Sequence, residues 1–164
     1  AHWMSPLFPE ESILHGRMRL VACLMSDFAW RENSSYRAAQ AFEQVLRAPI
    51  VGIDHWGRAF IGVAIHARYN GLANESDTVL ALRLIDDTDA KRAKLIGVCL
   101  RLGLTLSGGA ASVLSRTQLK IVDGVVTLRM YKEDEHLYTE LIERRLASVA
   151  HCLGLSSRFE FLEA

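Results

Sequence analysis

The amino-acid sequence predicts a mainly α-helical domain with a small β-hairpin near its C-terminus. Between residues 9 and 107, apolar side chains recur at steps of three and four, the spacing of one helix face. From Leu119 to Met130 the pattern changes to alternation around Asp123-Gly124, a pair typical of two-residue hairpin turns. Because no linker or internal repeat interrupts the chain, we expect one domain over residues 1–164.

The first helix is predicted to begin near Pro9-Glu10-Glu11, since proline and acidic residues are favoured in a first helical turn. Its inward face is expected to consist of five apolar residues, which are Leu14, Met18, Val21, Met25 and Phe28. The polar segment 31–35 follows. Asp27 is therefore expected near the helix end, beside a loop.

Three further helices and a short one are predicted before the hairpin. They are 36–48, which stops before Pro49; 55–69, with Asp54 as N-cap and Asn70-Gly71 after it; a short helix near 78–84; and 89–107, which ends at Gly108-Gly109. Their inward residues are expected to be Ala39, Phe42, Val45 and Leu46 in the second helix, and Leu95, Cys99, Leu102 and Leu106 in the long one.

The C-terminal third is predicted to contain a hairpin at 117–130, a helix at 134–153 and a strand at 159–162 beside the hairpin. Leu137, Leu141 and Ala150 would face inward from that helix, and Gly154 would end it. The chain begins Ala-His-Trp rather than with Met, so we expect either a fragment or a tag remnant at residues 1–4.

Composition indicates a globular cytoplasmic protein. The 164 residues carry a formal net charge of zero, which argues against bulk binding of nucleic acid or membrane surfaces. Fifteen of the nineteen basic residues are arginine, whose planar guanidinium suits phosphate oxygens. The three cysteines are far apart, which is typical of reduced, buried thiols, and no apolar run is long enough to span a membrane.

Ser26-Asp27 is the one stretch that resembles a metal-binding pair, that of a His-Asp hydrolase, but it has serine where histidine would be needed. His55 and His66 lie three turns apart on one helix, about 16 Å along its axis, and cannot hold one ion. We therefore expect neither a metal site nor catalytic residues in this chain. Asp27 is instead expected to hydrogen-bond the following loop or to pair with Arg31 or Arg37. Trp30 and Trp56 are expected to be core or interface aromatics.

Basic residues near Asp27 and on the third predicted helix suggest a groove for an anion. The candidate residues are Arg31, Tyr36, Arg37, His55, Arg58 and Arg68. Each arginine taken singly is explained equally well by a solvated surface position or an acidic neighbour.

Several stretches resemble the C-terminal part of bacterial exopolyphosphatases, in the exopolyphosphatase/guanosine pentaphosphate phosphatase family. They are RMRLVACLMSDFAWRENSSYRAAQAF at 17–42, GIDHWGRAFIGVAIHARYNG at 52–71, LIGVCLRLGLTLSGG at 95–109, KIVDGVVTLRM at 120–130 and ERRLASVAHCLGL at 143–155. Their order and joint presence over most of residues 5–155 carry the resemblance.

The resemblance implies a helical domain similar to a degenerate His-Asp phosphohydrolase domain, with Ser26-Asp27 as the relic of the metal pair. It further implies actin-like catalytic domains on the N-terminal side, which use Mg²⁺ or another divalent ion; no cofactor is expected in this domain. Arg37 is our candidate for replacing the metal's positive charge.

The expected function is to bind inorganic polyphosphate or another phosphate polyanion without catalysis, and to support a homodimer. No membrane or nucleic-acid partner is expected. Two alternatives stay open at this point, a self-sufficient metal-dependent phosphohydrolase and a pure oligomerisation module.

Overall fold

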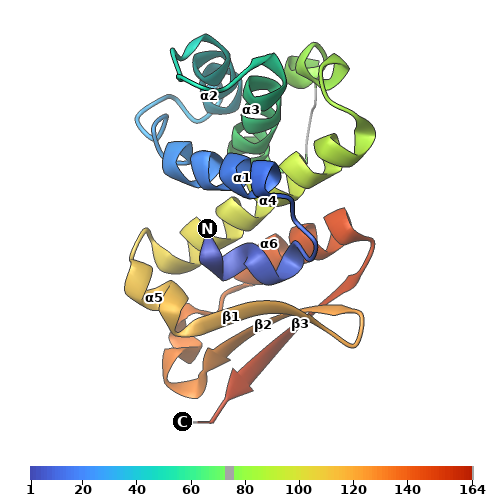
Figure 1. The fold of residues 1–164 in the computed structure, drawn as a ribbon. Coiled ribbons are helices and arrows are strands. Elements are labelled where there is room, and N and C mark those ends of the chain that lie inside the picture. Colours follow the sequence, from blue (N-terminus) through green and yellow to red (C-terminus); the bar gives the residue numbers. More distant parts are fainter. Residues whose placement is uncertain (73–75, 164) are drawn as a thin grey trace. The chain divides into compact units, whose positions relative to one another are not determined.

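A computed structural model describes residues 1–72 and 76–163 (Figure 1). The chain folds into two compact units, one made of residues 11–100 and the other of residues 1–10 with 101–164. The long helix α4, Asp87–Ser107, contributes to both units, so each unit is described separately. The fold is mainly helical with a small C-terminal sheet, as predicted.

Three helices accompany the first part of α4 in the unit of residues 11–100. They are α1 (Ile13–Met25), α2 (Arg37–Arg47) and α3 (His55–Asn70), with two short 3-10 turns, η2 (Ser76–Thr78) and η3 (Ala81–Arg83). The 3-10 turns occupy the region where one short helix was predicted. The N-cap prediction is confirmed for α3, because the Asp54 carboxylate accepts a hydrogen bond from the Gly57 amide at 2.8 Å.

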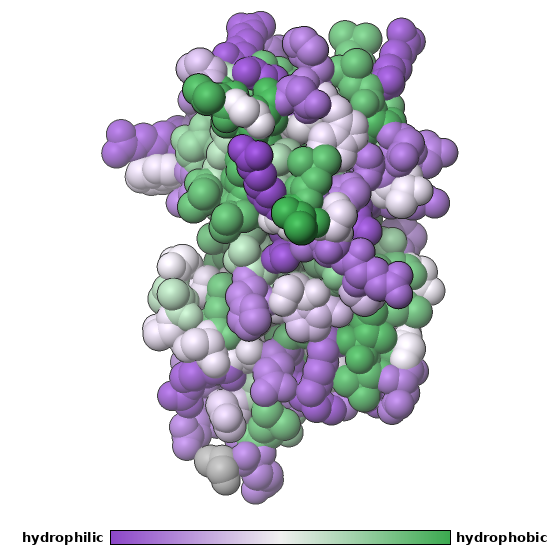
Figure 2. Space-filling model, in the orientation of Figure 1, coloured by the Kyte–Doolittle hydropathy of each residue, from purple (hydrophilic) through white to green (hydrophobic). Residues whose placement is uncertain are grey.

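Helix α1 begins later than predicted and buries a different face. Ser12 is its N-cap, and Met18 and Ala22 are its buried residues. Leu14 was expected inside but is 51% exposed, and Phe28 lies beyond the helix end and is 40% exposed. The sequence misleads here because α1 carries more apolar residues than one face holds. Ile13 and Leu24 remain on its outer side, and Figure 2 shows apolar and charged side chains intermixed on the face that it presents.

Helix α3 is the most buried element, with every residue from Ala59 to Ala67 inside the unit. Helix α4 approaches α3 closely at Gly97. A Cβ atom added at Gly97 of α4 would collide with the Ala64 carbonyl oxygen and with the Ala67 side chain. Glycine at this position therefore permits the two helix backbones to approach closely. The predicted inward residues of α4, Leu95, Cys99, Leu102 and Leu106, are all buried.

The unit of residues 1–10 and 101–164 is built on a three-stranded sheet of order β1-β2-β3. The predicted hairpin is confirmed as β1 (Thr117–Val122) and β2 (Val125–Tyr131), joined by Asp123 and Gly124 at φ values of 52° and 73°. Strand β3 (Ser156–Leu162) includes the predicted strand and pairs in parallel with β2.

Helix α6 (Glu140–Leu153) packs on this sheet and ends at Gly154, as predicted. It starts six residues later than expected, because residues Lys132–Leu137 form the 3-10 helix η4 and Thr139 caps α6. Leu141 was expected inside but is 38% exposed, whereas Ile142, Leu146, Val149 and Ala150 are buried. The helix is therefore rotated relative to the predicted inward face.

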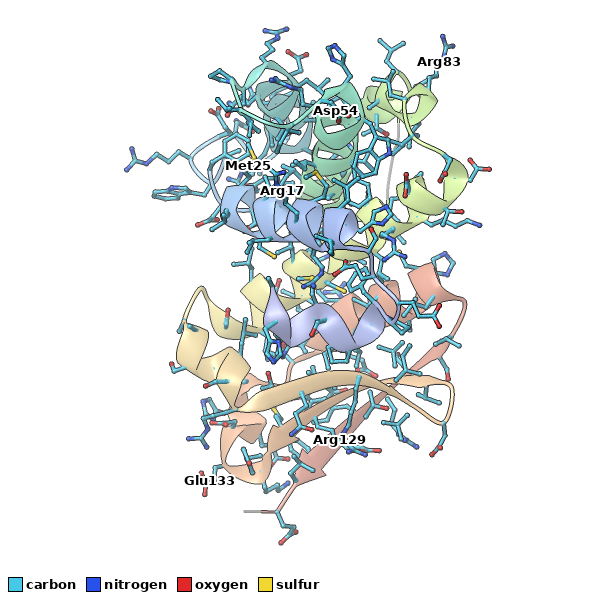
Figure 3. All side chains as sticks on the ribbon, viewed as in Figure 1. Arg17, Met25, Asp54, Arg83, Arg129 and Glu133 are labelled. Atoms are coloured by element: carbon cyan, nitrogen blue, oxygen red, sulfur yellow. The ribbon has the colours of Figure 1, made fainter. Side chains whose placement is uncertain are left out.

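The remaining elements cover the sheet unit. Helix η1 (His2–Leu7) lies against β1. Helix α5 (Ala111–Ser115) comes just before β1 in the chain. The Trp3 indole donates a hydrogen bond to the Thr117 hydroxyl at 2.8 Å, and Met4 is buried, so residues 2–4 contribute to the packing. Arg129, labelled in Figure 3, pairs with Glu160 across β2 and β3. Among the described residues, no helix has the length and apolar character needed to cross a bilayer.

We predict that Gly97→Ala destabilises the protein by about 1–3 kcal/mol, because the methyl group must push α3 and α4 apart. Urea unfolding followed by far-UV circular dichroism measures this effect. Gly16→Ala in α1 is the matched control, since the added methyl would approach the Glu11 carboxylate at 3.1 Å rather than collide with backbone, and alanine favours a helix. Equal effects of the two substitutions would contradict the close approach at Gly97.

Candidate functional site

Ser26 and Asp27 follow directly after Met25, the last residue of α1, which Figure 3 labels. The Ser26 side chain is buried, and its hydroxyl donates a hydrogen bond to the Cys23 carbonyl at 2.8 Å. Ser26 is the C-cap of α1, so this residue helps to end the helix. The Asp27 side chain is 66% exposed.

The Asp27 carboxylate pairs with Arg68, whose Nη2 lies 3.3 Å from Oδ1. Arg68 comes from the last turn of α3, and α1 packs against α3. The sequence had suggested Arg31 or Arg37 as the partner of Asp27, and this expectation is wrong. Tertiary packing of the two helices brings Arg68 to Asp27 from a distance of 41 residues along the chain.

Tyr69 lies near two guanidinium groups. The Arg68 guanidinium carbon is 4.1 Å from the centre of the Tyr69 ring, and that of Arg37 is 5.9 Å away. Arg37 also donates from Nε and Nη2 to the Glu32 carbonyl, at 3.0 and 2.7 Å. Arg68, rather than Arg37, is thus the positive charge next to Asp27, while Arg37 lies near the Tyr69 ring and is hydrogen-bonded to the Glu32 carbonyl.

Burial disfavours the charged form of Arg68 in this group of side chains. Loss of hydration lowers the pKa of Arg68, and the nearby Arg37 lowers it further, whereas Tyr69 and Asp27 act in the opposite direction. Burial also raises the pKa of Tyr69. The Arg68 Nε is buried and has no hydrogen-bond partner within the described part of the chain. An anion between Arg68 and Arg37 would compensate for both defects.

The loop between α1 and α2 presents two aromatic side chains to solvent. Trp30 is 57% exposed, which excludes the core alternative of the prediction and leaves the interface alternative as a prediction. The Arg31 guanidinium lies 5.0 Å from the centre of the Trp30 ring. Tyr36 is 66% exposed at the start of α2. Arg31, Tyr36, Arg37 and Arg68 therefore all belong to one region of the unit, the loop 26–37 and the last turn of α3.

His55 and Arg58 lie at the opposite end of α3, where Figure 3 labels Asp54. Ten residues separate Arg58 from Arg68, which corresponds to about 15 Å along the helix axis. Arg58 donates hydrogen bonds to the carbonyls of Leu46, Ala48 and Ile53, so its guanidinium holds the end of α2. The six predicted groove residues consequently fall into two groups, and only the first has guanidinium groups available for a ligand.

His66 and His15 each pair with an aspartate. His66 is buried and pairs with Asp77 at 3.3 Å. His15 pairs with Asp89 at 2.8 Å, and Asp89 also accepts a hydrogen bond from the Trp56 indole. Asp89 thus connects α1, α3 and α4, a role that the sequence analysis missed. Within residues 1–72 and 76–163, no three histidine, cysteine or acidic side chains gather as a metal site would require.

Tyr69 was also missed as a member of the site. A weak signal for it exists in the sequence, because aromatic and arginine residues are adjacent four times, at Arg158-Phe159 in β3 and at three pairs near this site, Trp30-Arg31, Tyr36-Arg37 and Arg68-Tyr69. Only the fold shows that these three pairs belong to one region.

We predict that Arg68→Ala destabilises the protein by about 1–3 kcal/mol, because the aliphatic stem and guanidinium lose their packing on Tyr69. Asp27→Asn should cost less than about 1 kcal/mol, since its carboxylate is mostly solvated and exposed ion pairs contribute little. A double-mutant cycle by urea unfolding separates the two effects. If Asp27→Asn costs as much as Arg68→Ala, the ion pair and not the packing holds Arg68.

Comparison with known proteins supports the family that the sequence resembles. A family model described as "Exopolyphosphatase, C-terminal" matches residues 7–161, which is nearly the whole chain. No curated protein matches it. The chain therefore belongs to the exopolyphosphatase C-terminal domain family.

Proposed function

We propose that this chain is the non-catalytic part of an exopolyphosphatase and that it binds inorganic polyphosphate at the cluster of Arg31, Arg37 and Arg68. The observation that carries the proposal is the half-buried guanidinium of Arg68, which has an unsatisfied Nε and lies near Arg37. A phosphate group offers charge and acceptors to both. Long polyanions suit such a surface, because several weak contacts add along one chain and release counterions.

Hydrolysis is assigned to N-terminal catalytic domains, as the family resemblance implies, with Mg²⁺ or another divalent ion bound there. In this chain the environment of Asp27 opposes metal-dependent catalysis. A metal ion at Asp27 would have to compete with Arg68, and Ser26 already uses its hydroxyl to end α1. We infer that the helical unit is a His-Asp-like scaffold in which Arg68 supplies the positive charge once supplied by a metal.

A role in assembly is the second candidate function, and the outer side of α1 favours it. Ile13 is 95% exposed, Leu24 77% and Leu20 49%, and these residues lie on one stripe of the helix. Contiguous exposed apolar residues of this kind often mark contacts with other proteins. The partners that we propose for this face of α1 are a second copy of the chain, in a homodimer, and the N-terminal catalytic domains.

Calorimetric titration with medium-length polyphosphate tests the binding proposal. We expect Arg37→Ala and Arg68→Ala each to weaken binding about tenfold, as loss of a charged hydrogen bond does. Affinity should also fall steeply between low and moderate salt. Arg47→Ala is the matched control, since Arg47 is an exposed arginine of α2 that pairs with Glu43 of the same helix. If polyphosphate affinity is unchanged in Arg37→Ala and Arg68→Ala but lower in Arg47→Ala, the assigned site is contradicted.

Arg58→Ala should separate stability from binding. Loss of its hydrogen bonds to three carbonyls is expected to lower the free energy of unfolding by about 1–3 kcal/mol. Polyphosphate affinity, measured by calorimetry at a temperature where the variant is folded, should stay within about twofold of the parent value. A tenfold loss of affinity would instead place Arg58 in the binding surface.

A further inference from the structure

The ring faces of Trp30 and Tyr36, in the loop 26–37, are not used by the phosphate contacts proposed for Arg31, Arg37 and Arg68. Trp30 and Tyr36 are 57% and 66% exposed, and polyphosphate has neither an apolar nor an aromatic group for them to contact. Exposed large rings are a feature of surfaces that bind other molecules. The proposed phosphate site thus does not explain why the same surface carries exposed aromatic rings.

The Trp30 ring lies beside a guanidinium group, and Tyr36 is next to an arginine in the sequence. Arg31 lies 5.0 Å from the centre of the Trp30 ring, and Tyr36 immediately precedes Arg37. A guanidinium on one face of Trp30 leaves its other face free to stack on a planar group. In the described residues, neither Arg31 nor Arg37 forms an ion pair with an acidic side chain. Their charges therefore remain available for a ligand.

Alternating rings and guanidinium groups match a ligand in which planar bases alternate with phosphates. Proteins that bind single-stranded nucleic acid combine base stacking on aromatic side chains with basic contacts to the backbone. A duplex would offer the phosphates but hide the faces of its bases. We propose that the loop 26–37, with Arg68 from α3, binds single-stranded nucleic acid, with bases on Trp30 and Tyr36 and phosphates on Arg31, Arg37 and Arg68.

The neutral charge of the whole chain does not exclude this interaction. Over the loop and the last turn of α3, Arg31, Arg37 and Arg68 face two acids, Asp27 and Glu32, and Asp27 is already paired with Arg68. The local surface is therefore positive, although modestly so, and affinity should depend strongly on salt. The inference rests on the proposed function, because both ligands would use the same guanidinium groups.

Fluorescence anisotropy with a labelled oligouridine of about twelve nucleotides tests the inference on the full chain at low salt. Trp30→Ala and Tyr36→Ala should each weaken oligouridine binding about five- to a hundredfold, the range for loss of one stacked base. Polyphosphate affinity of Trp30→Ala should change less than about twofold. Arg37→Ala should weaken both ligands. Val51→Ala, which removes an apolar side chain that is 94% exposed, is the control and should change neither.

Comparison of three ligands, which are the single strand, a paired duplex and a free nucleotide, identifies what the aromatic rings bind. We expect a fully paired RNA duplex and uridine triphosphate to bind at least about tenfold more weakly than the single strand, because one hides its bases and the other has only one. Equal binding of the duplex, or full oligouridine affinity in Trp30→Ala and Tyr36→Ala, would overturn the inference. Uridine triphosphate that binds as tightly as the oligonucleotide would overturn it in favour of free nucleotides.

Failure of the inference and failure of the proposed function give different results. Polyphosphate binding that needs Arg37, without any oligouridine binding, overturns the nucleic-acid site alone. Oligouridine binding that needs Trp30 and Tyr36, without polyphosphate binding, supports the nucleic-acid site and overturns the polyphosphate proposal.

Discussion

The close approach of α3 and α4 at Gly97 is the constraint on which the helical unit depends. The backbone carbonyl of Ala64 occupies the space that a Cβ atom would need if position 97 were any residue other than glycine. Packing of this closeness leaves α3 buried from Ala59 to Ala67. A helix enclosed in this way can present functional side chains only at its two ends, and this determines where a ligand can meet the unit.

The two ends of α3 have different roles. At the first end, Asp54 caps the helix and Arg58 binds carbonyls at the end of α2, so these polar groups are used by the fold. At the second end, Arg68 and Tyr69 meet the loop that leaves α1. Asp27 compensates only part of the buried guanidinium charge, and the Nε of Arg68 stays unsatisfied. This end, with its unmatched donors, is the region that gains most from a bound anion.

Local signals were sufficient for part of this structure. The Asp54 cap, the Asp123-Gly124 turn and the inward face of α4 depend on neighbours in the sequence, and each was predicted correctly. The pairing of Asp27 with Arg68 depends instead on how α1 crosses α3, which no spacing reveals. The exposed side of α1 was missed for a related reason, because an apolar stripe looks the same whether it faces the core or a partner. Of the six candidate ligand residues, the fold brings Arg31, Tyr36, Arg37 and Arg68 into one region and separates His55 and Arg58.

The central claim is that the loop 26–37 and the last turn of α3 form one anion-binding surface. Nuclear magnetic resonance tests it most directly, through backbone amide shifts of the ¹⁵N-labelled chain during titration with medium-length polyphosphate. The account predicts that the largest shifts occur in residues 26–37 and 67–70, and that they saturate together. Shifts concentrated at His55 and Arg58, or on the strands β1 to β3, would contradict it.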